Sequence, residues 1–188
     1  MENIILRLFH FRWNLAVIAE LYALEGAKFI TLVMKLGISR SVLSSTLKYL
    51  IGDGMVTPNP GYGHPLRPEY ILTASGQKAA LFCQELISSV HSQGQEHLLQ
   101  SKWALPVFFA AGLGEVRFIA LKTRLAPITP RALSEELKRL TEASYVSRNI
   151  LVDFPPVSMY ALTPKAQRYV EIYKKHEKEL QSLLDHRR

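Results

Sequence analysis

The sequence repeats itself at an interval of about 90 residues, and this repeat constrains the fold more than any other feature. Shifting the sequence by 90 residues places Trp13 on Trp103, and further apolar positions then keep the same offset along most of the chain. The matched pairs include Leu43 with Leu133, Ser44 with Ser134, Leu47 with Leu137, Lys48 with Lys138, Leu50 with Leu140, Val56 with Val146, Tyr70 with Tyr160, and Leu72 with Leu162. A chance match does not hold one offset across so many anchors. The sequence therefore predicts a duplicated domain.

Each copy has the same predicted order of elements. A first helix (residues 12–24 and 102–113) precedes a short second helix (28–36 and 117–125), a tight turn, and a third helix. Ser39 and Thr129 stand at the start of the third helices, where Ser and Thr are favoured N-caps. Two extended segments then flank a tip rich in turn-forming residues (55–57 with 69–72, and 145–151 with 157–162), and a long helix closes each copy (75–90 and 164–184). This is the order of a winged helix-turn-helix.

We therefore expect a mainly α fold with small β-hairpins, of the α+β class, as two tandem winged helix-turn-helix domains. The predicted boundaries are 1–91 for the first copy, 92–101 for a linker rich in Gln, Ser and Gly, and 102–188 for the second copy. The last helix places residues at alternating steps of three and four, the spacing of packed helices: Ala166, Tyr169, Tyr173, His176, Leu180 and Leu183. We expect the long helices of the two copies to pair within one chain as a pseudo-dimer. Packing of each long helix on its own domain, and pairing between two chains as a homodimer, are the alternatives.

Charge and composition narrow the class of partner. The chain of 188 residues has a formal net charge of +7 and a pI of about 9.6, which favours a polyanionic partner without proving one.

Its most apolar run, residues 104–114, is too short for a membrane span of about 20 residues. The N-terminus lacks the pattern of a cleaved signal peptide, so we expect a soluble cytoplasmic protein with no membrane partner. The single cysteine, Cys83, lies on an apolar helix seam and is expected to be a buried packing residue.

The third helix of each copy has one apolar and one polar face, and the polar face is the candidate binding site. Leu43, Leu47 and Leu50 form the apolar stripe of the first copy, and Leu133, Leu137 and Leu140 form that of the second. Lys and Arg can neutralise phosphates or bond guanine, and Ser can bond phosphates or base edges. The candidate DNA-binding residues are Arg40, Ser41, Ser44, Ser45 and Lys48 in the first copy, Arg131, Ser134, Glu135, Lys138 and Arg139 in the second, and Arg67 and Arg148 near the hairpins. A solvated helix face without a ligand is the alternative.

Glu135 departs from a purely basic face. It could accept from a cytosine amino group, orient Arg131 or Lys138, or weaken DNA binding by the second copy. Near the hairpin tips, Arg67 and His64 of the first copy and Arg148 of the second could reach the DNA backbone or the minor groove, with a purely structural turn as the alternative.

Catalytic and metal-binding patterns are missing from the sequence. There is no GxSxG, no P-loop, no GxGxxG after a strand and no HExxH among the six histidines. We therefore expect no enzyme, no metal and no cofactor.

Several short motifs of both copies match one known family. The second copy carries the stronger match, in Lys102-Trp103-Ala104-Leu105, Arg117-Phe118, residues 128–134, residues 137–140, Phe154-Pro155-Pro156-Val157, Tyr160 and Leu162-Thr163-Pro164. The first copy matches more loosely, through Arg12-Trp13, Lys28-Phe29, Ile38-Ser39, Asp53-Gly54, Leu72-Thr73 and Gly76. Through these motifs the sequence resembles the HxlR-type winged helix-turn-helix transcriptional regulators.

The resemblance implies a prokaryotic regulator that binds double-stranded DNA as a two-fold dimer, with the third helix in the major groove and the hairpin on flanking DNA. Members of this family are typically single-domain, and many carry a sensor cysteine ahead of the first helix. This chain is tandem, and residues 1–11 contain no cysteine. A protein-interaction scaffold and a replication-initiator-like protein are the alternative functions. Residues 1–95 carry a net charge of +2 and residues 96–188 carry +5, and this uneven charge supports the scaffold, with the first copy as an adaptor and the second copy as the DNA reader.

Overall fold

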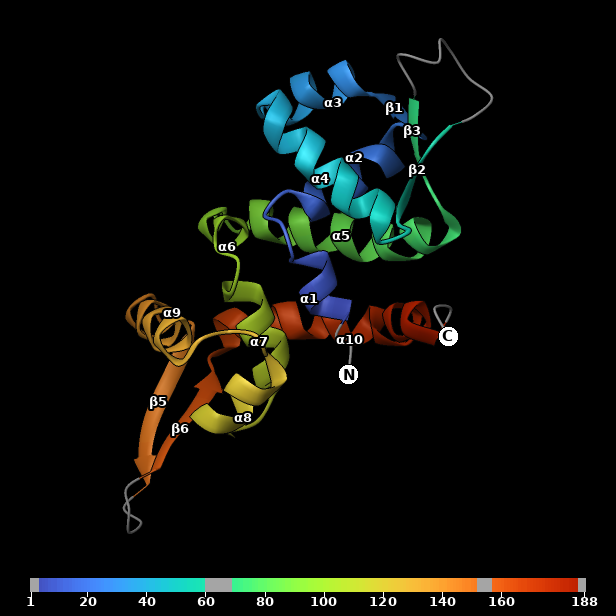
Figure 1. Ribbon diagram of the computed structural model, residues 1–188. Helices are drawn as coiled ribbons and strands as arrows, with labels where there is room; N and C mark the ends of the chain where they lie inside the picture. The colour runs from blue at the N-terminus through green and yellow to red at the C-terminus, as the bar shows by residue number, and fades with distance from the viewer. Residues whose placement is uncertain (1–3, 60–68, 152–156, 186–188) are drawn as a thin grey trace. The chain divides into compact units, whose positions relative to one another are not determined.

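The computed structural model describes residues 4–59, 69–151 and 157–185 and divides into two compact units (Figure 1). Unit 1 consists of Met1–Gly94 together with His176–Arg188, and unit 2 consists of Gln95–Lys175. Because the last helix contributes residues to both units, each unit is described by itself.

Unit 1 has the element order of a winged helix-turn-helix. Its elements are α1 (Ile4–Leu8), α2 (Asn14–Ala23), β1 (Ala27–Lys28), α3 (Phe29–Leu36), α4 (Arg40–Gly52), β2 (Val56–Pro58), β3 (Glu69–Leu72) and α5 (Ala74–Ser92). The strands form an antiparallel sheet in the order β1-β3-β2, with Ala27 opposite Tyr70 and Val56 opposite Leu72. The core lies between α2 and α5, where Val17, Ile18 and Phe82 have no exposed surface.

Unit 2 repeats this order. Its elements are α6 (His97–Gln100), α7 (Ala104–Ala111), β4 (Val116–Arg117), α8 (Phe118–Arg124), α9 (Pro130–Glu142), β5 (Val146–Leu151), β6 (Val157–Leu162) and α10 (Pro164–Asp185). The sheet order β4-β6-β5 is equivalent to that of unit 1, and β5 and β6 form a long antiparallel ribbon (Figure 1). In its aromatic core the Phe108 ring stacks on Tyr169, with centroids 6.1 Å apart, and meets Tyr145 at a tilt, with centroids 5.6 Å apart.

The tandem winged-helix architecture predicted from the repeat is confirmed. The first helices are shorter than predicted, and the two-residue strands β1 and β4 were not expected, because their partners lie more than 40 residues away along the chain. Short helices α1 and α6 were also not expected, and α6 occupies part of the segment predicted to be a linker.

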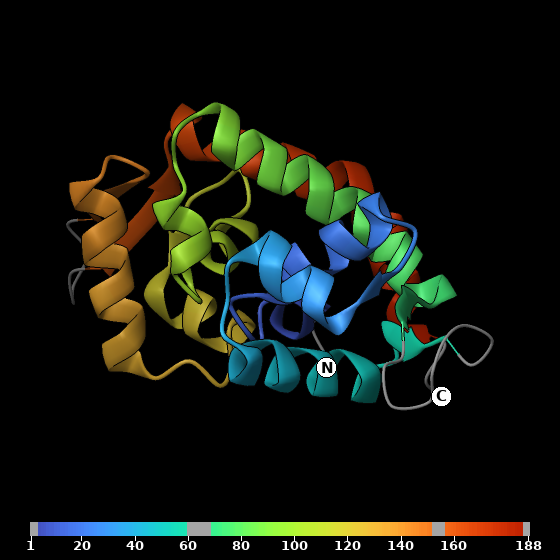
Figure 2. The ribbon, with the colours of Figure 1, turned by 90° about the horizontal axis from the view of Figure 1, so that it is seen from above.

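The long helices meet inside unit 1, where α5 packs against the last turns of α10 (Figures 1 and 2). The Phe82 ring lies edge-on to the ring of His176, with centroids 6.1 Å apart. His176 Nε2 is 2.8 Å from Glu85 Oε2, and Lys78 Nζ donates to Ser182 Oγ over 3.5 Å. These contacts agree with the expected meeting of the long helices within one chain.

Candidate nucleic-acid interface

The turn between α3 and α4 is built by two residues with matching local preferences. Gly37 ends α3 in the left-handed conformation (φ 62°), which glycine adopts without steric cost. Ser39 follows in an extended conformation, and its hydroxyl accepts from the Val42 N–H over 3.3 Å. In unit 2, Thr129 Oγ1 accepts in the same way from Ala132 N at 3.2 Å, and Pro130 occupies the first turn of α9. Both predicted N-caps are confirmed.

The predicted division of α4 into two faces is also confirmed. Leu43, Leu47 and Leu50 are at most 2% exposed, so this stripe packs in the core of unit 1. The predicted polar residues of this helix are all exposed: Arg40, Ser41, Ser44, Ser45 and Lys48. Figure 2 shows α4 at the edge of unit 1, with one side turned away from the rest of the unit.

Helix α9 has the same arrangement at the edge of unit 2 (Figure 2). Leu133, Leu137 and Leu140 are buried. The predicted polar residues Arg131, Ser134, Glu135, Lys138 and Arg139 are exposed.

The two polar faces differ in charge. Helix α4 carries two cations and no carboxylate, whereas α9 carries three cations and three carboxylates. On α9, Arg131 Nε lies 2.8 Å from Glu135 Oε1, and Lys138 Nζ lies 3.9 Å from Glu142 Oε1. Glu135 therefore lies within ion-pair distance of Arg131, whereas Lys138 lies near Glu142.

Arg139 is held toward the side of α9. Its Nη2 lies 2.5 Å from Glu136 Oε1, and the same oxygen accepts from Ser101 Oγ over 3.0 Å. The Glu136 side chain is only 11% exposed, so the pair ties the Arg139 guanidinium to the body of unit 2.

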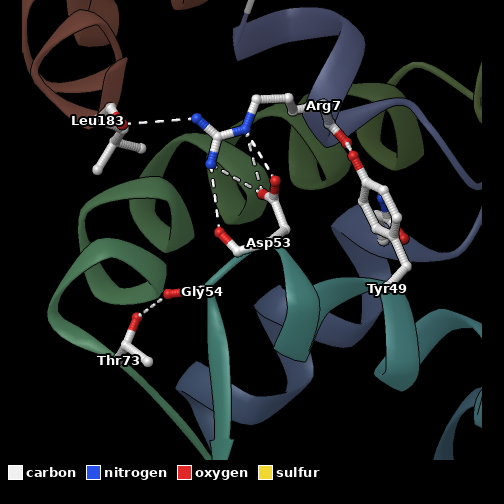
Figure 3. A network of polar contacts seen from close by, with 7 residues as sticks. Arg7, Tyr49, Asp53, Gly54, Thr73 and Leu183 are labelled. Carbon is white, nitrogen blue, oxygen red and sulfur yellow. Dashed lines mark hydrogen bonds and ion pairs between the residues drawn. The ribbon is translucent and has the colours of Figure 1, made fainter. Parts of the chain in front are cut away.

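A buried ion pair fixes the end of α4, and sequence reasoning did not find it. Arg7 Nε lies 2.9 Å from Asp53 Oδ1, and Nη2 donates to Asp53 Oδ2 over 3.0 Å (Figure 3). Asp53 is the C-cap residue of α4, and Tyr49 Oη donates to the Arg7 carbonyl oxygen over 3.2 Å. The pair therefore attaches α1 to the C-terminal end of α4. The sequence signal was weak, since these partners lie 46 residues apart.

Aromatic rings support the same end of α4. The His10 ring stacks on Tyr49, with centroids 4.2 Å apart and planes 4° from parallel, and Phe11 meets Tyr49 edge-on at 5.5 Å. A shallow hollow of about 670 Å³ lies between these rings and the exposed Ser45 and Lys48. Lys48 therefore lines the same hollow as the rings of His10, Phe11 and Tyr49.

Among the candidate DNA-binding residues near the hairpins, Arg148 on β5 is the one that the structure describes. Its Nε and Nη2 donate to Ser158 Oγ over 3.2 and 2.9 Å, so the exposed guanidinium is fixed across the β5–β6 ribbon. Further along β5, Ile150 is 61% exposed and Leu151 is 40% exposed. The candidates Arg67 and His64 lie outside the described residues.

Other classes of site receive no support from the described residues. Among residues 4–59, 69–151 and 157–185, no group of His, Cys, Asp and Glu side chains could hold a metal ion. In the same ranges, no helix is long and apolar enough to cross a membrane. Cys83 is buried, as predicted, and this burial raises the pKa of its thiol.

The family model described as HxlR-like helix-turn-helix matches the chain twice, over residues 8–97 and 98–186. The chain therefore belongs to the HxlR-like helix-turn-helix family and carries two tandem copies of its domain, which confirms both the repeat and the resemblance. A search of curated proteins gives no match.

Several solved structures are similar to about half of this chain, and the matched half spans most of each of those structures. A MarR-family transcriptional regulator from Porphyromonas gingivalis W83 is 24% identical over 46% of this chain and 85% of its own, with a TM-score of 0.42. The diamide-treated YodB from B. subtilis is 22% identical over 48% of this chain and 89% of its own, with a TM-score of 0.39. A MarR-family regulator from Enterococcus faecalis V583 is 22% identical over 53% of this chain and 93% of its own, with a TM-score of 0.42.

Proposed function

We propose that this protein is a transcriptional regulator that binds duplex DNA through its winged-helix units. The observation that carries the proposal is the exposed polar face of α4, which combines Arg40 and Lys48 with three serines and contains no carboxylate. The helix that bears this face is the second of a helix-turn-helix, held by an N-cap at one end and by the Arg7–Asp53 pair at the other. A rigid cationic helix of this kind suits the major groove of B-DNA.

Each candidate residue has a role suited to its chemistry. Lys48 and the serines of α4 contact phosphates or base edges, as do Arg131, Ser134 and Lys138 of α9. The arginines at the flanks position the units on the DNA backbone: Arg40, Arg67, Arg139 and Arg148. Glu135 can accept from a cytosine amino group when Arg131 turns to a phosphate.

The proposal includes the setting in which such a protein works. A regulator of this family acts in the cytoplasm of a prokaryote, where it meets DNA, and it is not an enzyme. The contact between α5 and α10 inside unit 1 supports a pseudo-dimer in which one chain supplies both winged helices.

A salt series tests the proposal. Fluorescence anisotropy of a labelled random-sequence duplex should give an affinity for the full chain that falls linearly with salt on logarithmic axes, because phosphate neutralisation releases counterions. The double variant Arg40→Ala/Lys48→Ala should bind about 10-fold or more weakly near 0.1 M salt. Lys178→Ala, which removes an exposed cation from α10, is the matched control and should bind like the wild type. Binding that does not depend on salt, or no binding, would contradict the proposal.

A protein-interaction scaffold is the second candidate, and the exposed Ile150 and Leu151 of β5 favour it. Apolar side chains at the end of a hairpin suit a protein partner better than a phosphate backbone. The same salt series separates the two, since a scaffold would not bind the random duplex. A replication initiator would bind DNA like a regulator, and a selection of bound sequences from a random pool would then show an origin-like site.

A further inference from the structure

We infer that the two recognition helices contribute unequally to DNA binding, so that α4 supplies the attraction for phosphates and α9 contributes little to affinity. This inference rests on the proposed function and specifies which surface performs it.

The internal repeat allows a position-by-position comparison. Lys48 of α4 and Lys138 of α9 occupy equivalent positions, 90 residues apart. The residue three positions earlier is Ser45 in the first copy and Glu135 in the second. The residue four positions later is Gly52 in the first copy, whereas Glu142 stands there in the second. The same lysine therefore has uncharged neighbours on α4 and carboxylates on α9.

The side-chain geometry follows this difference. Each of the three cations of α9 lies within ion-pair distance of a carboxylate on the same helix. Arg40 and Lys48 have no such partner in the part of the chain that the structure describes. The cations of α4 are therefore available to phosphates without first leaving a carboxylate.

The decisive effect comes from the carboxylates rather than from the strength of the pairs. Exposed pairs such as Arg131 with Glu135 are weak, and a phosphate can displace the glutamate. The displaced glutamate remains on the helix within a Debye length of about 10 Å and repels the same phosphate. A duplex that approaches α9 therefore meets as many negative charges as positive ones, whereas at α4 it meets cations alone.

The charge of the whole second half gives the opposite impression, and the structure explains why. Residues 96–188 carry the larger net charge, yet their excess of cations does not lie on α9. The excess lies outside α9: residues 115–124 carry three cations and one carboxylate, whereas α10 carries five cations against four carboxylates and adds only one net positive charge. Net charge by half of the chain is therefore a poor guide to which recognition helix attracts DNA.

Matched single variants of the full chain test the inference, with a labelled random-sequence duplex as the probe over a salt series. Lys48→Ala should weaken binding about five- to ten-fold near 0.1 M salt and reduce the logarithmic salt slope by about 1. Lys138→Ala, at the equivalent position, should weaken binding less than about two-fold. Both lysines are exposed, as are Ser45 and Glu135, which are exchanged below. Thermal melts should confirm that the variants remain folded.

Exchanging the residues at the equivalent positions 45 and 135 provides a second test, in which one variant should bind DNA more weakly and the other more tightly. Ser45→Glu places a carboxylate beside Lys48 and should weaken binding about as much as Lys48→Ala. Glu135→Ser removes one from α9 and should strengthen binding about three-fold. Equal losses for the two lysine variants, or no gain from Glu135→Ser, would overturn the inference while the regulator proposal stands. A wild-type chain that shows no salt-sensitive binding would overturn both.

Discussion

Arg7 and Asp53 form a buried two-point ion pair that joins the first helix of unit 1 to the end of its recognition helix (Figure 3). The two side chains are only 10% and 7% exposed. Arg7 also donates to the Asp53 carbonyl oxygen over 3.3 Å and to the Leu183 carbonyl oxygen over 3.5 Å. Its guanidinium thus connects three segments of unit 1 that are distant in sequence.

Breaking this pair should destabilise unit 1 strongly. Arg7→Ala leaves the Asp53 carboxylate buried without its counter-charge, which costs about 3 kcal/mol or more. Chemical denaturation monitored by circular dichroism would measure the loss. Arg12→Ala removes an exposed arginine that lies 5.0 Å over the Trp13 ring and should cost less than about 1 kcal/mol. Equal effects of the two variants would mean that the buried pair contributes little.

Gly76 on α5 should not tolerate a side chain. A Cβ at this position would clash with the Met55 carbonyl oxygen, an atom that also accepts from the Thr73 N–H over 3.0 Å. Gly76→Ala must therefore move backbone at the start of the hairpin, and we expect a loss of about 2 kcal/mol or more in unfolding free energy.

Gly52 provides the matched control for this substitution. It is also helical, its conformation is ordinary, and a Cβ there would meet no atom within 4 Å. Gly52→Ala should be neutral or should stabilise by up to about 1 kcal/mol, because alanine favours helix. Parallel thermal melts of the two variants would check the contrast, and a Gly76→Ala protein as stable as the wild type would contradict the close approach.

The sequence predicted those features of the fold that depend on neighbours along the chain. The leucine stripes of α4 and α9 follow from helical spacing, and the caps at Ser39 and Thr129 follow from local side-chain chemistry. These signals also placed β3 at its observed bounds, because turn-forming residues mark the ends of a strand.

The remaining features depend on partners distant in sequence. Strand β1 has two residues and exists because it pairs with β3, so no local pattern announces it. The seam spacing of α10 showed that one side would be buried but not against which helix, and its last turns pack on α5 of unit 1. The Arg7–Asp53 pair was missed for the same reason, since its partners lie 46 residues apart and no local pattern links them. The candidate binding faces were predictable because helix amphipathicity defines both sides at once.

The Cys83 thiol should be unreactive in the folded protein. Burial raises its pKa, and the thiolate is the reactive form. A disulfide reagent should find no reactive thiol in the native chain and one after denaturation. Ser88→Cys places a second thiol at an exposed position of the same helix and should add one that reacts without denaturant. Rapid reaction of the native wild type would show that α5 opens readily.

The stability of unit 2 should fall in mild acid because of His97. Partial desolvation lowers the pKa of His97 below its ordinary value of 6.5, and the positive charges of Arg139 and Lys165 add to this effect against the opposing Glu96. Its Nε2 lies 3.1 Å from the Tyr145 hydroxyl, which can donate to the neutral ring. Because the unfolded chain takes up a proton more readily, stability is full above pH 6.5 and is lost as the pH falls from there toward the lowered pKa.

The variant His97→Asn should remove this part of the pH dependence. Urea unfolding of unit 2, followed at pH 7 and at pH 5, should show a larger loss of unfolding free energy for the wild type than for the variant. An NMR titration of the imidazole protons would report the pKa of His97 in the folded chain directly. A wild type and a variant with the same pH dependence, together with a His97 pKa at or above 6.5, would contradict the assignment and would mean that the positive neighbours are screened by solvent.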